Sequence, residues 1–197
     1  MSTFADLEDI VQDNVNDSTA DVVQPIDDAI DYLSNFFGLN KIDTSQDTAV
    51  DGTTLDIPTG SKKILSVKVG DDFIEKISIS KIAEMEENGA QRFYEFNSKI
   101  NFTDEFDSVE DTEIFYEAKF TRLAGVAAAV CDVPEYLQPL LVIYATYFYY
   151  MKMLATMATS RESYPDIEPE ELRQYAKEWK ETGDELLMSI YEKSDIV

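Results

Sequence analysis

The sequence lacks histidine altogether and contains a single cysteine, Cys131, in 197 residues. Histidine is the commonest general base and the commonest metal ligand in proteins, so its absence removes many hydrolytic and metal-dependent mechanisms. One cysteine cannot form a disulfide within the chain, and the fold must therefore hold through packing. Without an imidazole partner to activate it, Cys131 is expected to be a buried, inert thiol. These absences argue against most classes of enzyme.

Glycine is also scarce, with seven in the chain, and none of them fall in the spacing of a phosphate-binding loop. Serine and threonine nucleophiles lack a histidine base, just as the cysteine does. We therefore expect no catalytic residues, no bound cofactor and no metal site. The protein is expected not to be an enzyme.

Positive charge is in short supply. Lys and Arg number 16 against 40 Asp and Glu, which gives a net charge of -24. A free-standing protein that binds nucleic acid or an anionic membrane carries the opposite sign. Half of the charge, -12, lies in the first sixty residues, whereas basic residues concentrate between positions 62 and 99. This imbalance fits ordinary solubility, and it equally fits the wall of a DNA conduit, because a repelling wall lets the duplex slide.

Long apolar runs are limited to one stretch, residues 136–157. It contains Gln138, Pro139, Thr146 and Lys152, and its aromatic residues are mostly polar-tipped tyrosines. We therefore expect a helix that protein buries on most sides, rather than a membrane span. The acidic N-terminus has neither the basic region nor the apolar core of a secretory signal. No membrane association is expected.

Hydrophobic periodicity divides the chain into three parts. Residues 1–40 show helical spacing, residues 41–123 mostly alternate with a period of two, and residues 124–197 are helical again. We therefore expect an α+β fold, in which the N- and C-terminal helices form an α-helical bundle that carries a small antiparallel β-insert with one short helix. The length suits one domain with such an insert.

The expected elements follow from apolar spacing and from turn and capping residues. Helices are expected at 3–14, from Pro25 to about 37, and at 80–88, 134–159 and 170–192. Strands are expected at 54–57, 63–69, 73–79, 92–96, 99–102 and 113–122. Residues 40–50 show no pattern and are predicted to form a loop.

The strongest local anomaly is a run of aromatic residues in the first of the two long C-terminal helices. Tyr144, Tyr147, Phe148 and Tyr150, together with Tyr149, cover all sides of a helix, so a single apolar stripe cannot bury them. One explanation is a central helix packed on several sides within the chain. The other is contact with another subunit, because aromatic residues concentrate in interface cores. The sequence leaves both explanations open.

One pattern points to catalysis. Glu117 and Lys119 are two residues apart on an expected strand and therefore share a face. With Asp104, Asp107 or Asp111 upstream, the pair resembles the acid-x-lysine core of metal-dependent nucleases, in which carboxylates hold Mg²⁺ and the lysine helps to activate water. The same pair also fits a plain ion pair between strands. The excess of negative charge opposes the nuclease, because it would repel the substrate.

The order of segments resembles a known family. After an acidic helical N-terminus come, in order, LDIP (55–58), ILSVKV (64–69), the hairpin FYEFNSKINF (93–102), IFYEAKF (114–120), VPEY (133–136), LLVIYATY (140–147), an acidic turn and a long polar helix. This order is similar to that of the head-to-tail adaptor (connector) proteins of tailed bacteriophages, a group that includes the tail tubular A or gatekeeper proteins. The similarity covers nearly the whole chain and is strongest from Leu55 to about Tyr191.

The resemblance implies a structural virion protein of the neck, or tail vertex, that is made in the host cytoplasm. It implies subunits that assemble as a ring, usually a dodecamer, which binds the portal protein and serves as a platform for the tail, nozzle or another neck protein. It also implies that DNA passes through the lumen during ejection without specific binding.

The resemblance further implies that the two long C-terminal helices make the lateral contacts and that the β-insert faces the next tail component. Residues 189–197 become an expected docking tail. Trp179, Ile190, Tyr191 and Ile196 join the aromatic run as expected interface residues. Two other functions stay as alternatives: the nuclease, and an acidic protein that mimics DNA charge and binds a basic partner with salt-sensitive affinity.

Overall fold

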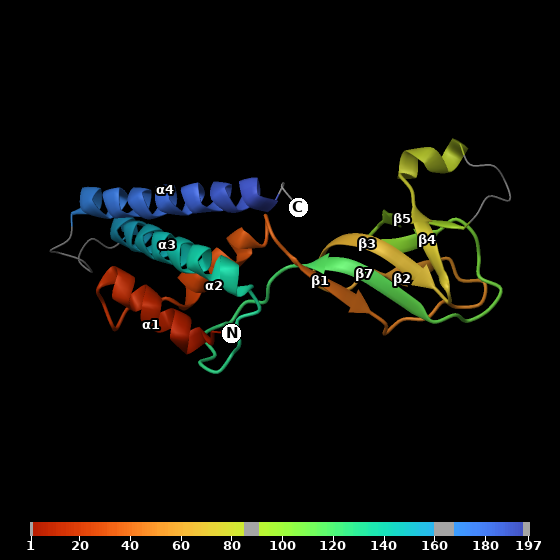
Figure 1. Cartoon of the computed structure of the whole chain (residues 1–197), viewed down its shortest axis with the longest axis horizontal. Coiled ribbons are helices and arrows are strands. Elements are labelled where there is room, and N and C mark those ends of the chain that lie inside the picture. The colour runs from red at the N-terminus through yellow and green to blue at the C-terminus, as the bar shows by residue number, and fades with distance from the viewer. Residues whose placement is uncertain (1, 85–90, 160–167, 195–197) are drawn as a thin grey trace. The chain divides into compact units, whose positions relative to one another are not determined.

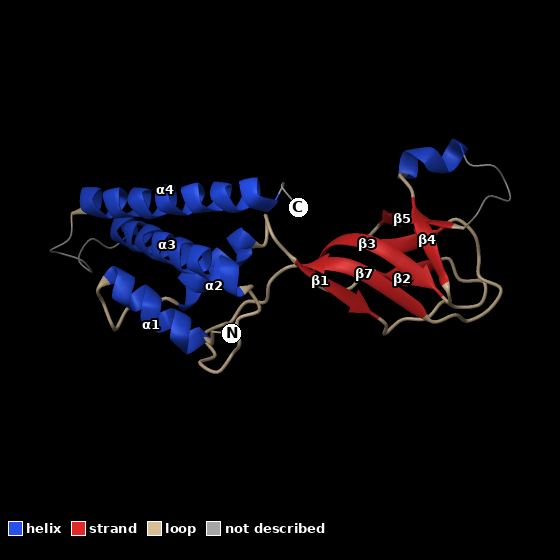
Figure 2. Cartoon of the chain, viewed as in Figure 1, coloured by secondary structure: helices blue, strands red, loops and turns tan. Residues whose placement is uncertain are grey.

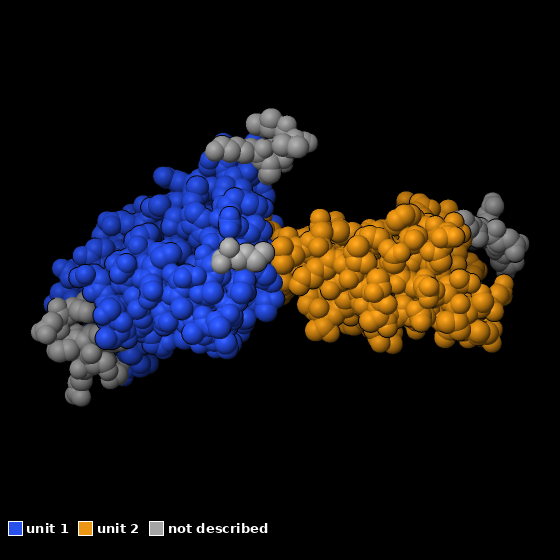
Figure 3. All heavy atoms as spheres, turned by 60° about the horizontal axis from the view of Figure 1, so that its bottom comes forward, with its two compact units in different colours: residues 1–36, 120–197 blue, residues 37–119 orange. Residues whose placement is uncertain are grey.

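The structure is a computed structural model, and the residues that it describes are 2–84, 91–159 and 168–194. The chain divides into two compact units (Figure 3). Met1–Phe36 and Phe120–Val197 form a helical unit, whereas Phe37–Lys119 form a β unit. The two ends of the chain thus build one unit and the middle builds the other. The unit boundaries differ by four residues from the divisions expected after residues 40 and 123.

The helical unit is arranged around one central helix (Figure 1). Its described elements are α1 (Phe4–Val15), α2 (Val23–Leu33), the short 3-10 helix η2 (Glu135–Leu137), α3 (Gln138–Thr159) and α4 (Pro169–Ser194). The central helix α3 contacts each of α1, α2 and α4. Within this unit α1 and α4 lie on opposite sides of α3 (Figure 1).

Capping and apolar spacing account for α1. The hydroxyl oxygen of Thr3 accepts a hydrogen bond from the backbone N–H of Asp6, whose carboxylate accepts one from the N–H of Thr3 at 2.7 Å. This reciprocal pair satisfies two of the free donors at the start of the helix. Phe4, Leu7 and Val11 then recur on one buried face.

A buried carboxylate holds the returning chain against α2. Asp27 is 7% exposed, and its Oδ1 accepts hydrogen bonds from the backbone N–H groups of Leu123 at 2.9 Å and Ala124 at 3.3 Å. About two turns further on, just after the end of α2, the Ser34 hydroxyl accepts a hydrogen bond from the N–H of Phe120 at 3.1 Å. Because buried polar groups need partners, these bonds fix where the segment after the β unit rejoins the helices. The helix α2 ends at Leu33, earlier than expected.

The β unit is a single seven-stranded sheet with the order β1-β7-β3-β4-β5-β6-β2. All seven strands that the structure describes belong to this unit (Figure 2). Its described elements are β1 (Leu39–Asp43), β2 (Thr54–Asp56), β3 (Ser61–Val69), β4 (Asp72–Lys76), the 3-10 helix η1 (Ile79–Glu84), β5 (Arg92–Phe96), β6 (Lys99–Phe102) and β7 (Thr112–Ala118). The strands β4 and β5 pair in parallel, and the other neighbours pair antiparallel.

The core of the β unit comes from side chains that alternate with exposed ones along the strands. Ile64 and Val67 of β3, Phe93 of β5, Ile100 of β6 and Ile114 of β7 are each at most 1% exposed. Burial of one such branched or aromatic side chain stabilises a fold by roughly 1.5–3 kcal/mol. The unit therefore has a core of its own.

The expected fold class is wrong in its β part. The strands form a seven-stranded mixed sheet that dominates its own unit, rather than a small antiparallel insert on a helical bundle. The edge strand β1 lies where a loop was predicted; it has one neighbour and no buried residue, so no alternation marks it. The parallel pair β4–β5 needs a long crossover, and residues 77–91 are long enough to provide one.

Two smaller differences concern element bounds. The last strand ends at Ala118 rather than at residue 122, because the chain leaves the sheet to bond with α2. The short helix predicted at 80–88 is the 3-10 helix η1 over Ile79–Glu84, and the rest of that prediction lies outside the described residues.

Candidate interaction surface

The aromatic run lies on α3, and its first member is internal. Tyr144 is 1% exposed. Its hydroxyl donates a hydrogen bond to Oδ1 of Asp184 in α4 at 2.9 Å, and its ring centroid lies 4.6 Å from that of Tyr32 in α2. Burial, reinforced by the hydrogen bond to Asp184, raises the pKa of Tyr144. Tyr144 therefore joins three helices and offers no surface to a partner.

Two other predicted interface residues belong to an aromatic group inside the helical unit. The ring of Tyr32 lies 6.0 Å from Phe148 and 5.2 Å from Phe36, and Phe36 lies 6.3 Å from Tyr191. The Tyr191 hydroxyl donates a hydrogen bond to the carbonyl of Phe36 at 3.3 Å. Phe148 and Tyr191 remain half-buried. Tyr32 and Phe36 are not among the predicted site residues, although their four-residue spacing on an expected helix is the signal for such a pair.

Tyr147 and Tyr150 are half-buried. The ring of Tyr150 lies 5.5 Å from Tyr175 of α4, and burial raises the pKa of Tyr150. Tyr147 packs against Phe148 with centroids 5.0 Å apart. The run is therefore divided between rings that bind the helices together and rings that keep some exposed area.

The remaining predicted interface residues lie on α4 or beyond it. Trp179 and Ile190 are half-buried on α4. Ile196, in the expected docking tail, lies outside the described residues. The structure thus places the predicted residues that it describes on the packed helices α3 and α4.

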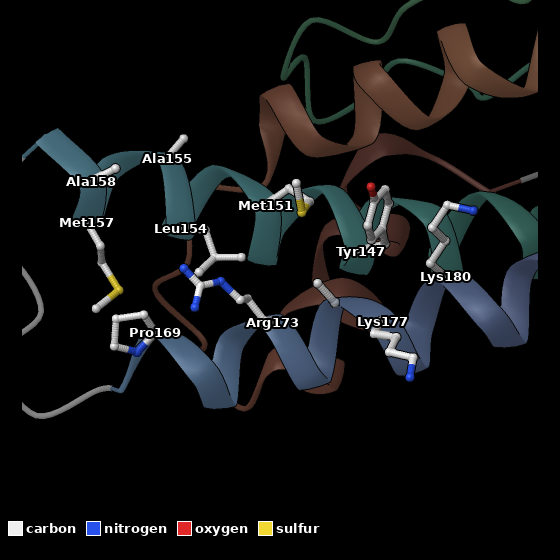
Figure 4. A pocket seen from close by; sticks show the side chains of 11 residues that line it. Tyr147, Met151, Leu154, Ala155, Met157, Ala158, Pro169, Arg173, Lys177 and Lys180 are labelled. Carbon is white, nitrogen blue, oxygen red and sulfur yellow. The ribbon is translucent and has the colours of Figure 1, made fainter.

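An apolar groove of about 700 Å³ lies between α3 and α4 (Figure 4). From α3 it is lined by Tyr147, Met151, Leu154, Ala155, Met157 and Ala158. The α4 side contributes Pro169, Ala176 and three basic residues. Met157 points toward Pro169, and Arg173 reaches from α4 toward Leu154 (Figure 4). Met151 is 42% exposed, so the apolar lining is accessible.

Basic side chains line the α4 side of this groove. Arg173, Lys177 and Lys180 recur at four- and three-residue spacing, which places them along one face of the helix. They are three of the seven basic residues in the helical unit. This basic stripe is not among the residues predicted from the sequence, although its spacing is visible there.

Each cation of the stripe pairs with an acid of its own helix. The distances are 2.9 Å for Arg173–Glu170, 3.7 Å for Lys177–Glu181 and 2.5 Å for Lys180–Asp184. The hydrogen bond to Asp184 raises the pKa of Lys180. Exposed pairs of this kind contribute about 0.3–0.5 kcal/mol each, so they hold the cations only weakly.

Among the described residues, the carboxylates of the nuclease hypothesis do not form a metal site. Glu117 accepts a hydrogen bond from Nζ of Lys62 at 2.8 Å, and Lys62 also donates to the carbonyl of Phe37. Lys119 is exposed just after β7. Asp111 precedes the other end of β7, roughly 20 Å from Glu117 at the rise of an extended strand. In the part of the chain that the structure describes, no three Asp, Glu or Cys side chains are close enough to hold a metal ion.

By length and composition alone, the helical stretch Glu135–Thr159 is apolar enough to cross a membrane. Its most apolar window has a mean hydropathy of 1.2, and 44% of that window is buried within the protein. The central helix of a folded domain passes the same test, and α3 packs against three other helices. One such helix is weak evidence for a membrane span.

Comparison with known protein families finds no matching family model, and no curated protein matches the sequence. The features from which function can be argued are therefore the groove, the distribution of charge and the order of the elements.

Proposed function

We propose that the protein is a structural subunit of the ring that joins the portal protein to the tail in a tailed bacteriophage. The observation that carries this proposal is the helical unit built from both chain ends, with an apolar groove of about 700 Å³ open at its surface. Accessible apolar grooves are typical of contacts between proteins. The order of segments, which is similar to that of head-to-tail adaptor proteins, supports the same function.

The two units suit two kinds of contact. We assign the contacts between neighbouring copies to the helical unit, where α3 and α4 form the groove. We assign the contact with the next tail component to the β unit, where Phe73 is 66% and Leu65 is 42% exposed. Large apolar side chains at the surface favour burial against a partner. The portal contact is assigned to a chain end, with residues 189–197 as the docking tail.

The net charge of -24 supports a passive role toward DNA. A ring of such subunits, with twelve as the proposed number, would surround its lumen with acidic protein. Phosphates are repelled by such a surface, so DNA would pass without binding. The proposed location is the neck of the virion.

The test is the mass of the protein by light scattering after size exclusion, alone and mixed with the portal ring of its own phage. We expect co-elution that adds about one 22.4 kDa chain for each portal subunit. In purified virions, quantitative mass spectrometry should find the chain at the copy number of the portal.

A protein that stays monomeric and never co-elutes with the portal contradicts the proposal. The two alternatives then make separate predictions. A nuclease would cleave DNA with Mg²⁺ and lose that activity in Lys119→Ala, whereas a DNA mimic would bind a basic protein with an affinity that falls steeply with salt.

A further inference from the structure

The outer face of α1 is acidic with one apolar side chain among the carboxylates. Asp6, Asp9, Ile10 and Asp13 are exposed, and they lie away from the buried stripe of the helix. Ile10 is 46% exposed, although it is a large apolar residue. Residues 1–36 contain nine acidic residues and neither Lys nor Arg. This face therefore suits a partner surface that is basic at its rim and apolar within.

The groove between α3 and α4 has that character. Its apolar lining includes Met151 and Leu154, and its rim carries the stripe Arg173, Lys177 and Lys180. Along α4 the lining runs from position 169 to position 180, roughly 16 Å at the helical rise of 1.5 Å per residue. The helix α1, with 12 residues, is roughly 18 Å long. The two surfaces are thus similar in length and opposite in charge.

The charges also agree in register when the two helices run antiparallel. The acids of α1 are separated by steps of three and then four residues. Read from its C-terminal end, the basic stripe of α4 has the same steps of three and four. Antiparallel packing therefore pairs Asp6 with Lys180, Asp9 with Lys177 and Asp13 with Arg173. Ile10, next to the central acid Asp9, would then face the apolar lining of the groove. If the helices ran parallel, Asp9 and Lys177 would be out of register by one residue.

We propose that α1 of one copy occupies the groove between α3 and α4 of a second copy, antiparallel to α4. This inference rests on the proposed function, because it names the contact between neighbouring subunits of the ring. In one copy α1 and α4 lie on opposite sides of α3, so the two surfaces cannot meet each other (Figure 1). The contact is therefore head-to-tail, the kind that closes into rings or extends into filaments.

The acids already beside the stripe do not block this contact. Glu170, Glu181 and Asp184 each take one cation of the stripe, in pairs that are exposed and close in sequence. Lysine and arginine have several donors, so each cation can hold its own acid and a carboxylate of the second copy. Asp6 keeps its capping bonds to Thr3, which also fix its position on the face.

Two variants that each remove one surface test the contact. The first carries Asp9→Lys and Ile10→Lys, and the second carries Arg173→Glu and Lys177→Glu. We expect each alone to need at least ~10-fold more protein for half-assembly than the wild type, by sedimentation velocity. Their equimolar mixture should form dimers and nothing larger, because only one α1 face and one groove remain intact.

The four substituted side chains are exposed, and circular dichroism should show unchanged folding. The control is Met188→Lys, at a side chain of α4 that is 60% exposed and outside the groove; it should assemble like the wild type.

Three results overturn the contact: variants that assemble like the wild type, a mixture that grows beyond dimers, and a wild type that never self-associates. None of these results bears on co-elution with the portal, and that measurement tests the ring proposal independently.

Discussion

The helical unit and the β unit use their basic residues in different ways. In the β unit five of the nine cations form pairs that join neighbouring strands, namely Lys62–Glu117, Lys68–Glu113, Lys76–Glu95, Arg92–Glu75 and Lys99–Asp56. In the helical unit three cations lie together along one groove, and their pairs stay within a single helix. The pairs of the β unit connect separate strands. The pairs along the groove connect residues of one helix, which the helix backbone already holds together.

This difference indicates where the protein can exchange partners. A pair between strands cannot be given up without weakening the sheet, and partly buried pairs such as Lys62–Glu117 would leave a charge without a partner. An exposed pair one turn apart on a helix costs little to rearrange. The groove is therefore the basic surface of the helical unit that is suited to binding, whereas the paired cations of the β unit are structural.

The largest change in the free energy of unfolding is expected from a substitution in the core of the β unit, and it tests whether the two units are independent. Ile114 is fully buried, so Ile114→Ala should lower the free energy of unfolding of the β unit by about 2–5 kcal/mol. Trp179, the one tryptophan of the sequence, lies in the helical unit and reports on that unit alone. The urea concentration at which β-unit peptides lose protection from hydrogen exchange should fall. The urea midpoint of the Trp179 fluorescence transition should stay the same.

Ile114→Val is the matched control and should cost only about 0.5–1.5 kcal/mol. If the urea midpoint of the fluorescence transition falls together with that of hydrogen exchange in the sheet, the two units unfold as one. That result would contradict the prediction that they are stabilised separately.

A smaller loss is expected where the helical unit fixes the returning chain. Asp27→Ala removes the acceptor of two buried N–H groups, those of Leu123 and Ala124. Leaving such donors without a partner costs about 1–3 kcal/mol, and here the Trp179 transition should move. Asp28→Ala is the control, because the carboxylate of that neighbour accepts an exposed hydrogen bond from Gln24. If both substitutions lowered the free energy of unfolding equally in urea, the buried hydrogen bonds of Asp27 would contribute no more stability than the exposed bond of Asp28.

Much of the helical unit is predictable from the sequence, because its signals are local. The capping box at Thr3 and the spacing of Phe4, Leu7 and Val11 give α1 within a residue or two. The sheet is less predictable, because β1 is recognised as a strand only by its pairing with β7, far along the chain. The groove depends on how α3 and α4 pack, so sequence spacing reveals the basic stripe but not the apolar space beside it.

The burial of Tyr144 gives the helical unit a weakness at alkaline pH. Burial and the bond to Asp184 raise the pKa of Tyr144 above its ordinary value of 10.0. Above pH 10 the unfolded chain loses this proton while the folded chain keeps it, so the free energy of unfolding should fall by up to about 1.4 kcal/mol per pH unit. Below pH 10 both states are protonated and the contribution is constant.

Tyr144→Phe should remove this part of the alkaline slope, measured by urea unfolding of the Trp179 signal between pH 9 and 11 (roughly one unit on each side of the ordinary tyrosine value). Tyr136→Phe, at a ring that is 65% exposed, should leave the slope unchanged. Parallel curves for wild type and Tyr144→Phe would contradict the prediction.

The smallest expected effect is the direct test of the two kinds of ion pair. Lys62→Met should cost about 1 kcal/mol, because Glu117 and the carbonyl of Phe37 both lose a partly buried donor. Lys177→Met should change the free energy of unfolding by less than about 0.5 kcal/mol, because its pair with Glu181 is exposed and lies one turn along the same helix. Both substitutions keep a long apolar side chain, so urea unfolding compares the charges alone. If Lys177→Met cost as much as Lys62→Met, the basic stripe would be as structural as the pairs between strands, and its availability to a second copy would be lost.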